Sequence, residues 1–148
     1  MSVIIRRAIV EDANVIAPLF NAYRMFYRQH SNIGAALDFI TKRLAQNQSA
    51  IFIADDGGKA VGFTQLYPIF SSVGLTNAWL LNDLYVTEGN RGKGVATALL
   101  EAAKQLGRKT GSGWLMLQTA VNNHIAQKVY GQNGWIKEKD YEVYTFTL

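Results

Sequence analysis

The chain has 148 residues, of which 49% are hydrophobic and 18% charged, and its formal net charge at pH 7 is +4. This length and composition predict one soluble domain spanning residues 1–148. The absence of cysteine excludes disulfides, a thiol nucleophile and thiolate metal ligands. No apolar run reaches the roughly 20 residues of a membrane span and the N-terminus lacks a secretory pattern, so we expect a cytoplasmic protein without membrane contacts.

Basic residues are concentrated in one part of the chain. Of the fifteen Lys and Arg residues, five lie between positions 91 and 109, where Glu101 is the only acid. Such a patch suits a phosphorylated ligand, although a solvated helix face has the same composition. Because these residues are not interleaved with aromatic side chains, a nucleic-acid partner is not expected.

The first half of the chain predicts a strand, two helices and a hairpin. Residues 3–9 are rich in β-branched side chains, and apolar side chains then recur at helical spacing over 12–27 and 34–46. Asp12 is the expected N-cap of the first helix, and residues 28–32 form the expected loop between the helices. Strand-like segments at 50–54 and 60–67 flank Asp55-Asp56-Gly57-Gly58, a sequence typical of a hairpin turn.

The second half predicts strands at 79–86 and 114–119, with a helix at 95–109 between them. A short helix at 123–133 is expected to end at Gly134, and residues 135–139 and 141–147 predict a final pair of strands. The element order indicates an α/β (mixed α+β) fold with helices on both faces of a mixed sheet of about seven strands. Strands 79–86 and 114–119 should run parallel through a right-handed crossover.

A glycine-rich loop joins the strand at 79–86 to the helix at 95–109. Gly92 and Gly94 let the backbone approach a ligand closely, and the start of the helix adds unpaired N–H groups. This arrangement predicts a phosphate site, with Arg91 and Lys93 adding positive charge. A P-loop is excluded because Val95 follows Gly94, and no acid ends the strand at 114–119 to hold the ribose of a dinucleotide.

Two motifs resemble those of the GNAT superfamily of N-acetyltransferases. The first, Arg91-x-x-Gly94-x-Ala96, follows a strand that ends Asp83-Leu84-Tyr85-Val86 and resembles the acetyl-CoA motif of that family. The second, Asn123-x-x-Ala126-x-x-x-Tyr130-x-x-x-Gly134-Trp135, is similar to a signature that usually ends in Gly-Phe. The pattern is closest to diamine and histone/polyamine members. Diamine acetyltransferases carry a second acid where this chain has Asn82.

The resemblance implies an enzyme that transfers acetyl from acetyl-CoA to a primary amine by direct attack, through a tetrahedral intermediate. Its two parallel strands, numbers 4 and 5, would splay to admit the pantetheine arm, and no metal is implied. Tyr130 would protonate the leaving thiolate, with a core aromatic as the alternative interpretation. Carried over from the family, the cofactor contacts are Leu84, Tyr85, Val86, Arg91, Gly92, Lys93, Gly94, Val95, Ala96, Thr97, Asn123, Ala126 and Tyr130.

Asp83 is a carboxylate within an otherwise apolar strand. Such a group is costly to bury unless it is paired, hydrogen-bonded or hydrated. It is a candidate to bind a cationic amine or to lead a proton away, and a structural ion pair with a basic residue is the alternative. Strand alternation predicts that Asn82 and Asp83 point to opposite faces of the sheet.

The resemblance places the acceptor pocket at the first two helices, their connection and the strand around 64–72. The candidate acceptor residues there are Tyr27, Arg28, His30, Gln65, Tyr67 and Asp83. A small amine, a polyamine or an amino acid is favoured as acceptor, while a protein lysine or N-terminus is an alternative. A non-catalytic acyl-CoA sensor is the alternative from another class. The sequence leaves the oligomeric state open, with a homodimer as one option.

Overall fold

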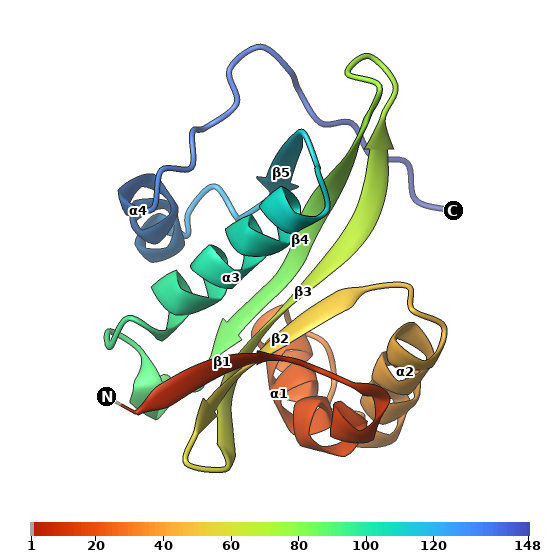
Figure 1. The fold of residues 1–148 in the computed structure, drawn as a ribbon. Coiled ribbons are helices and arrows are strands. Elements are labelled where there is room, and N and C mark those ends of the chain that lie inside the picture. Colours follow the sequence, from red (N-terminus) through yellow and green to blue (C-terminus); the bar gives the residue numbers. More distant parts are fainter. Residues whose placement is uncertain (1) are drawn as a thin grey trace. The chain divides into compact units, whose positions relative to one another are not determined.

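The computed structural model describes residues 2–148 of the chain, in two compact units, Met1–Gln118 and Thr119–Leu148. Figure 1 labels the elements along the chain. The first unit contains β1 (Val3–Arg7), the short 3-10 helix η1 (Val10–Asp12), α1 (Ala13–Phe26), α2 (Ile33–Ala45), β2 (Ala50–Asp56), β3 (Lys59–Ser71), β4 (Thr76–Val86), the 3-10 helix η2 (Glu88–Asn90), α3 (Val95–Lys109) and β5 (Trp114–Leu117). The second unit contains α4 (His124–Gln132).

The first unit is built on a five-stranded mixed sheet in the order β1-β2-β3-β4-β5. Neighbouring strands from β1 to β4 are antiparallel, and β4 and β5 are parallel. One apolar cluster joins the sheet to α1 and α2, and another joins it to α3. Each amphipathic helix thus buries its apolar stripe against one face of the sheet. This confirms the predicted mixed sheet with helices on both faces, and α3 has the predicted bounds.

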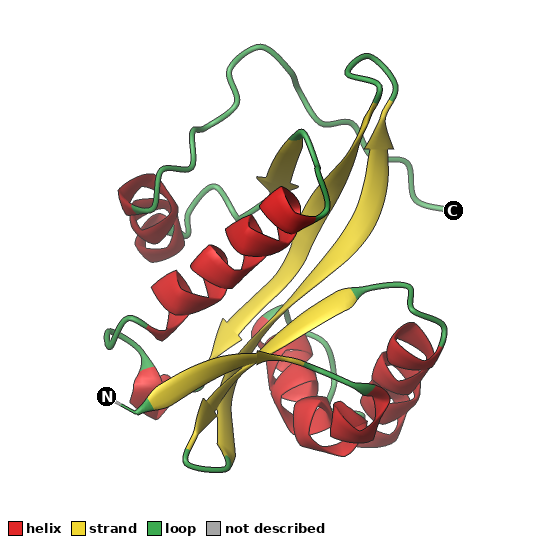
Figure 2. Ribbon diagram, in the orientation of Figure 1, coloured by secondary structure: helices red, strands yellow, loops and turns green. Residues whose placement is uncertain are grey.

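The number of strands differs from the sequence prediction. Within residues 2–148 the sheet has five strands rather than about seven, because residues 135–139 and 141–147 form no strand (Figure 2). Alternating side chains favour an extended backbone, but a strand also needs a partner for its N–H and C=O groups. No such pairing forms here, and the side chains of Tyr141, Val143, Tyr144 and Phe146 are exposed.

The end of α4 agrees with the sequence prediction. Gly134 adopts a positive φ of 83°, which a residue with a side chain rarely adopts. The N–H of Trp135 donates to the carbonyl of Tyr130 at 3.0 Å, and the N–H of Gly134 donates to that of Gly131 at 3.3 Å. This is a Schellman motif, which satisfies carbonyls at the end of the helix.

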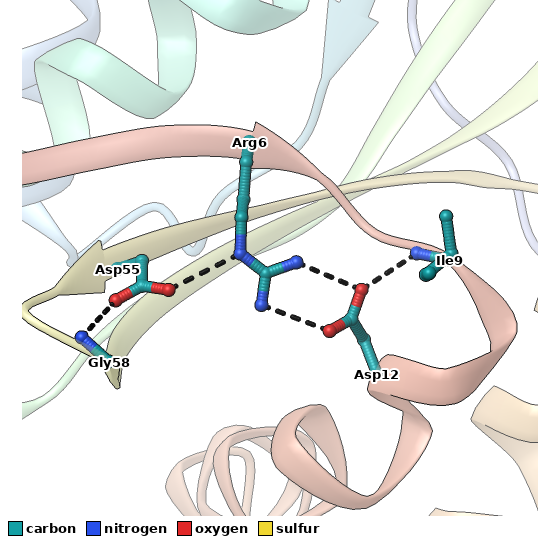
Figure 3. A network of polar contacts seen from close by, with 5 residues as sticks. All are labelled: Arg6, Ile9, Asp12, Asp55 and Gly58. Atoms are coloured by element: carbon teal, nitrogen blue, oxygen red, sulfur yellow. Dashed lines mark hydrogen bonds and ion pairs between the residues drawn. The ribbon is translucent and has the colours of Figure 1, made fainter.

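An ion-pair network ties the start of α1 to the sheet (Figure 3). Arg6 on β1 donates two hydrogen bonds of 3.0 Å to the carboxylate of Asp12 and one of 3.3 Å to Asp55. The N–H of Ile9 also donates to Asp12, at 2.8 Å. Asp12 occupies the N-cap position of α1, as predicted, but its carboxylate makes no capping hydrogen bond to the first turn of the helix. Arg6 and the N–H of Ile9 satisfy its oxygens instead.

The network predicts how the stability of the protein depends on pH. The hydrogen bonds from Arg6, with that of Ile9, hold the pKa of Asp12 below its usual value. The ionised carboxylate of Asp12 therefore contributes to the free energy of unfolding at neutral pH. This contribution is lost as the pH falls through the pKa of Asp12 in the folded protein. Asp12→Asn should lower the free energy of unfolding at pH 7 by about 1–2 kcal/mol, because charge-assisted hydrogen bonds are lost. Urea unfolding at pH 7 and pH 3 measures this.

The matched control is Asp38→Asn, which removes an exposed pair with Lys42 on α2. We expect this substitution to change the free energy of unfolding by less than about 0.5 kcal/mol. Equal losses in the two variants would contradict the role assigned to Asp12. So would a loss in Asp12→Asn that persists undiminished at pH 3.

Candidate functional site

The second half of β4 has an unpaired edge. β4 pairs with β3 from Thr76 to Val86, but its pairing with β5 runs only from Ala78 to Leu81, because β5 ends at Leu117. On the side of β5, the backbone of residues 82–86 therefore has no strand partner within the first unit. An edge of this kind offers N–H and C=O groups to the amides of an extended ligand.

A β-bulge at Asn82 lies at the point where β5 ends. Leu81 of β4 pairs with Leu66 of β3 and Asp83 pairs with Gln65, so Asn82 is an extra residue without a partner of its own. Because Leu66 and Gln65 are adjacent, they point to opposite faces of β3. The bulge therefore places Leu81 and Asp83 on opposite faces, although a regular strand would put them on the same one.

The carboxylate of Asp83 is held by two side-chain amides. Gln65 Nε2 donates to one oxygen at 2.6 Å, and Asn82 Nδ2 donates to the other at 2.7 Å. Ser49 Oγ donates to Gln65 Oε1 at 2.8 Å, which fixes the orientation of the Gln65 amide. The prediction that Asn82 and Asp83 point to opposite faces is wrong, because the bulge brings their side chains together.

Asp83 is buried without a cation. Its exposed fraction is 1%, and within residues 2–148 it forms no ion pair, which contradicts the alternative of a structural pair with a basic residue. Burial raises the pKa of Asp83 to about 6, and the hydrogen bonds from Asn82 and Gln65 limit that rise. A carboxyl group with this pKa can accept or release a proton close to neutral pH.

We expect the carboxyl of Asp83 to titrate with a midpoint near pH 6. Carbon-13 NMR of protein labelled at the aspartate carboxyl groups measures it, and the Asp83→Asn variant assigns the signal. Asn82→Ala should move the midpoint upward, because it removes a hydrogen bond that favours the charged form. A midpoint below about 4.5, in the range of an exposed aspartate, would contradict the burial and the bonding pattern described here.

Aromatic side chains from α1 and β3 lie on the same side of the sheet as this carboxylate. The hydroxyl of Tyr23 donates to the carbonyl of Asn82 at 2.9 Å, and its ring packs edge-on against Phe63, 6.0 Å between centroids. Burial, together with the negative charge of Asp83, raises the pKa of Tyr67 to about 12. Tyr67 therefore stays a neutral hydroxyl at physiological pH, available as a donor to a ligand beside Asp83.

The structure places the predicted acceptor residues in two groups. Gln65 and Tyr67 lie with Asp83 on the face of the sheet that α1 and α2 cover. Tyr27 is half exposed, and its ring lies 5.0 Å from the ring of Tyr23. Through Tyr23 it is connected to this group of residues. Arg28 and His30 are exposed, and within the described chain no hydrogen bond or ion pair links their side chains to this group. Arg28 and His30 therefore belong to the loop between α1 and α2 and not to the group of residues around Asp83.

The glycine loop between β4 and α3 presents a row of backbone donors. Gly92 and Gly94 have positive φ angles of 74° and 83°, and a Cβ on either would meet no atom within 4 Å. Among the described residues, the backbone N–H groups of residues 92–96 donate to no acceptor. An open loop with unsatisfied N–H groups at the start of a long helix fits a phosphate group. Thr97 lies in the same first turn of α3.

The two basic residues of the loop fold back onto its backbone. Arg91 Nε donates to the carbonyl of Val86 at 2.9 Å, and its guanidinium lies 5.6 Å from the centre of the Tyr85 ring. Lys93 Nζ donates to the carbonyl of Gly89 at 2.9 Å. These contacts hold the loop in shape and keep both positive charges beside the donor row. The predicted cofactor contacts in the first unit thus fall in two segments, Leu84–Val86 at the end of β4 and Arg91–Thr97 in the loop and first turn of α3, with η2 between them.

The remaining predicted residues belong to the second unit. Asn123 precedes α4, and its side-chain oxygen accepts a hydrogen bond of 3.2 Å from the N–H of Ala126, so it caps the helix. Tyr130 is half buried, and its ring lies 6.4 Å from that of Trp135. Within this unit, α4 and its N-cap therefore carry the three predicted residues.

Two polar residues near Asp83 were not predicted from the sequence. Ser49 precedes β2 and supports Gln65, but a lone serine between a helix and a strand carries no distinctive pattern. Arg43 lies in the last turn of α2, where a cation is ordinary because it complements the helix dipole. Only its surroundings in the fold distinguish it.

The described residues contain no group of three or more His, Cys, Asp or Glu side chains placed to bind a metal ion. None of the helices in the described part of the chain combines the length and the hydropathy that a membrane crossing requires.

Comparison with known proteins identifies relatives across most of the chain. Residues 16–135 match the family model described as the acetyltransferase (GNAT) family. The Bacillus subtilis (strain 168) protein "Uncharacterized N-acetyltransferase YhfO" is 45% identical over 144 residues, which cover 97% of each chain. A crystal structure of a "probable acetyltransferase" superimposes with a TM-score of 0.92 at 39% identity, covering 98% of this chain and 97% of the other.

A more distant solved structure shares the fold. The aminoglycoside N-acetyltransferase AAC(6')-Iy, in complex with CoA, superimposes with a TM-score of 0.81 at 23% identity, covering 99% of this chain and 95% of the other. At this level of identity, the likeness concerns the fold alone.

Proposed function

Since the chain belongs to the GNAT family of acetyltransferases and is an N-acetyltransferase, we propose that it transfers the acetyl group of acetyl-CoA to a small primary amine. A small amine, a polyamine or an amino acid would serve as acceptor, and residues 1–148 would act as one catalytic domain. The observation that carries this proposal is the buried carboxylate of Asp83. It has no cationic partner in the described chain and lies beside the unpaired edge of β4.

The glycine loop is the proposed binding site for the diphosphate of CoA. The N–H groups of residues 92–96 would donate to its oxygens, and the positive end of the α3 dipole and Lys93 would add attraction. The open edge of β4 at Leu84–Val86 would pair with the amides of the pantetheine arm. Asn123 and Ala126, at the start of α4, are further proposed cofactor contacts. CoA supplies the acetyl group as a thioester.

Gly94→Ala tests the role of the loop in CoA binding. The left-handed backbone at Gly94 should make this substitution cost roughly 1–2 kcal/mol of stability. A methyl group in the donor row should also weaken CoA binding about tenfold, since one charge-assisted hydrogen bond is worth that much. Isothermal titration calorimetry with CoA measures the affinity.

Gly111→Ala is the matched control for this substitution. Gly111 has a φ of 64° and open space at its Cβ position, but it follows α3 instead of preceding it. We expect a similar loss of stability and an unchanged CoA affinity. If both variants bind CoA as tightly as the unmodified protein, residues 92–96 are not the diphosphate site.

Asp83 has the properties needed to bind and deprotonate the amine. A primary amine is a cation at neutral pH, with a pKa near the 10.4 of lysine, and it must lose a proton before it can attack a carbonyl. The carboxylate of Asp83 would attract the ammonium group and accept that proton, directly or through water. As the C–N bond forms and the C–S bond breaks, Tyr130 would donate a proton to the departing thiolate.

Acetyl-CoA-dependent release of free thiol with a panel of primary amines tests this mechanism. We expect kcat/KM to rise with pH through an apparent pKa near 6, because the ionised form of Asp83 is the active one. Asp83→Asn should reduce the rate at pH 8 by about 100-fold or more and abolish the rise near pH 6. Thermal denaturation of the variant checks that it folds.

Asp38→Asn, which removes an exposed carboxylate from α2, is the control for charge and should leave the rate unchanged. Calorimetric binding of acetyl-CoA without thiol release for any amine of the panel would favour the non-catalytic acyl-CoA sensor. A rate that Asp83→Asn leaves unchanged would remove Asp83 from the mechanism while leaving the family assignment intact.

A further inference from the structure

Arg43 carries a positive charge that no acceptor in the described chain satisfies. Its Nε atom is buried and has no hydrogen-bond partner, and the side chain makes no ion pair within residues 2–148. Its guanidinium lies over the ring of Phe39, 4.4 Å from the ring centre. Buried polar groups in folded proteins nearly always have a partner, so an unsatisfied arginine donor calls for a specific explanation.

Packing holds this guanidinium in place. Phe39, one turn earlier on α2, stacks on Phe20 of α1 with 5.5 Å between ring centroids. Phe20 in turn packs edge-on against Phe63 of β3, 6.3 Å away. Arg43 therefore lies over an exposed ring that stacks on the buried Phe20, and no carboxylate in the described chain bonds to it.

The helix that carries Arg43, α2, covers the face of the sheet on which Asp83 lies. Phe63, Gln65 and Tyr67 alternate along β3 on the side that α1 and α2 cover, and Gln65 binds Asp83. The carbonyl of Arg43 accepts a hydrogen bond of 2.9 Å from the N–H of Gln48, the residue before Ser49, which bonds to Gln65. The last turn of α2 is thus connected, through Gln48 and Ser49, to the side chain of Gln65 that binds Asp83.

Tyr67 lies within the field of both charged groups. Burial is the main cause of the raised pKa of Tyr67; the negative charge of Asp83 raises this pKa further, and the positive charge of Arg43 lowers it. The neutral hydroxyl of Tyr67 is therefore near both a carboxylate that lacks a cation and a guanidinium that lacks an anion. A ligand with a cationic group and an anionic group would satisfy both.

We propose that Arg43 binds the carboxylate of the acceptor while Asp83 holds its amino group, so that the acceptor is a small amino carboxylate. This rests on the proposed function, since Asp83 is taken as the site of the reacting amine. A guanidinium binds a carboxylate through two parallel N–H donors, a geometry that a lysine does not offer. A polyamine would place a second positive charge near Arg43, and the repulsion would disfavour it.

Kinetics with matched acceptors test this assignment. The panel consists of α-amino acids, β-alanine and 4-aminobutyrate, each compared with its own carboxamide, together with putrescine. We expect a higher kcat/KM for the best amino carboxylate than for its amide or for putrescine. The amino group of an α-amino carboxamide has a lower pKa than that of the corresponding amino acid, so a larger fraction of it is neutral at a given pH. Amine reactivity alone would therefore favour the amide.

Substitution of Arg43 should raise KM only for acceptors that carry a carboxylate. In Arg43→Met we expect an increase of roughly 10- to 100-fold for the amino carboxylate, with kcat and the KM of the amide nearly unchanged. Arg43→Lys should give an intermediate KM, because it retains the charge but loses the planar fork. A purely structural role would instead affect both acceptors alike.

Arg7→Met is the matched control, because Arg7 also lies over an aromatic ring, that of Phe52 at 5.6 Å, but on β1. We expect it to leave both KM values unchanged. Thermal denaturation compares the stability of all variants.

A binding measurement separates this proposal from the proposed function. Thermal-shift titration with the amino carboxylates and amides requires no acetyl transfer. If the unmodified protein acetylates no amine, the proposed function fails, but stabilisation by amino carboxylates that Arg43→Met abolishes would still support the Arg43 site. The site is ruled out if Arg43→Met changes the responses to carboxylates and amides equally, or if it changes neither.

Discussion

The bulge at Asn82 is the feature on which the candidate site depends. It reverses the alternation of β4 after Leu81, so that Asp83 faces α1 and α2 together with Gln65. The same extra residue brings the Asn82 amide to the Asp83 carboxylate. Because the pairing with β5 also stops at Leu81, the carboxylate lies next to residues 82–86, a stretch of β4 that has no strand partner on the side of β5 within the first unit. One inserted residue therefore decides the face of the sheet on which the carboxylate of Asp83 lies.

Two carboxylates in this fold show how surroundings decide the role of an aspartate. Asp12 is paired with Arg6, which lowers its pKa, and it fastens a helix to the sheet. Asp83 is bonded only to neutral amides, and burial raises its pKa. A paired carboxylate stabilises the fold at neutral pH, whereas an unpaired buried one reduces its stability there. Such a cost is typical of groups retained for binding or proton transfer.

Charge complementarity accounts for the proposed choice of acceptor. The carboxylate of Asp83 and the guanidinium of Arg43 each lack an oppositely charged partner in the described chain, and neutral Tyr67 is close enough to feel both. A simple amine would satisfy only the first of these groups. An amino carboxylate would satisfy both groups. Specificity would then arise because ligands without a carboxylate leave the guanidinium of Arg43 unpaired.

The sequence alone determined most of the fold and the glycine loop, because those features have local causes. Helical periodicity predicted α3 with the observed bounds, and glycines at 92 and 94 marked the open turn before it. The order of strands and helices predicted parallel β4 and β5 strands, since a helical crossover joins them. Alternation also predicted strands at 135–139 and 141–147, but it could not supply the partner on which a strand depends.

Tertiary structure decided the surroundings of the two charged groups. A bulge depends on the register between β3 and β4, so the sequence of β4 by itself predicted the wrong face for Asn82 relative to Asp83. Arg43 looked like an ordinary cation at the end of a helix, and only packing on Phe39 and the lack of an acceptor distinguish it. Composition and periodicity specify which residues are present along each element. Whether a charged group such as Asp83 or Arg43 has an oppositely charged partner depends on contacts between distant segments. Only the folded chain defines those contacts.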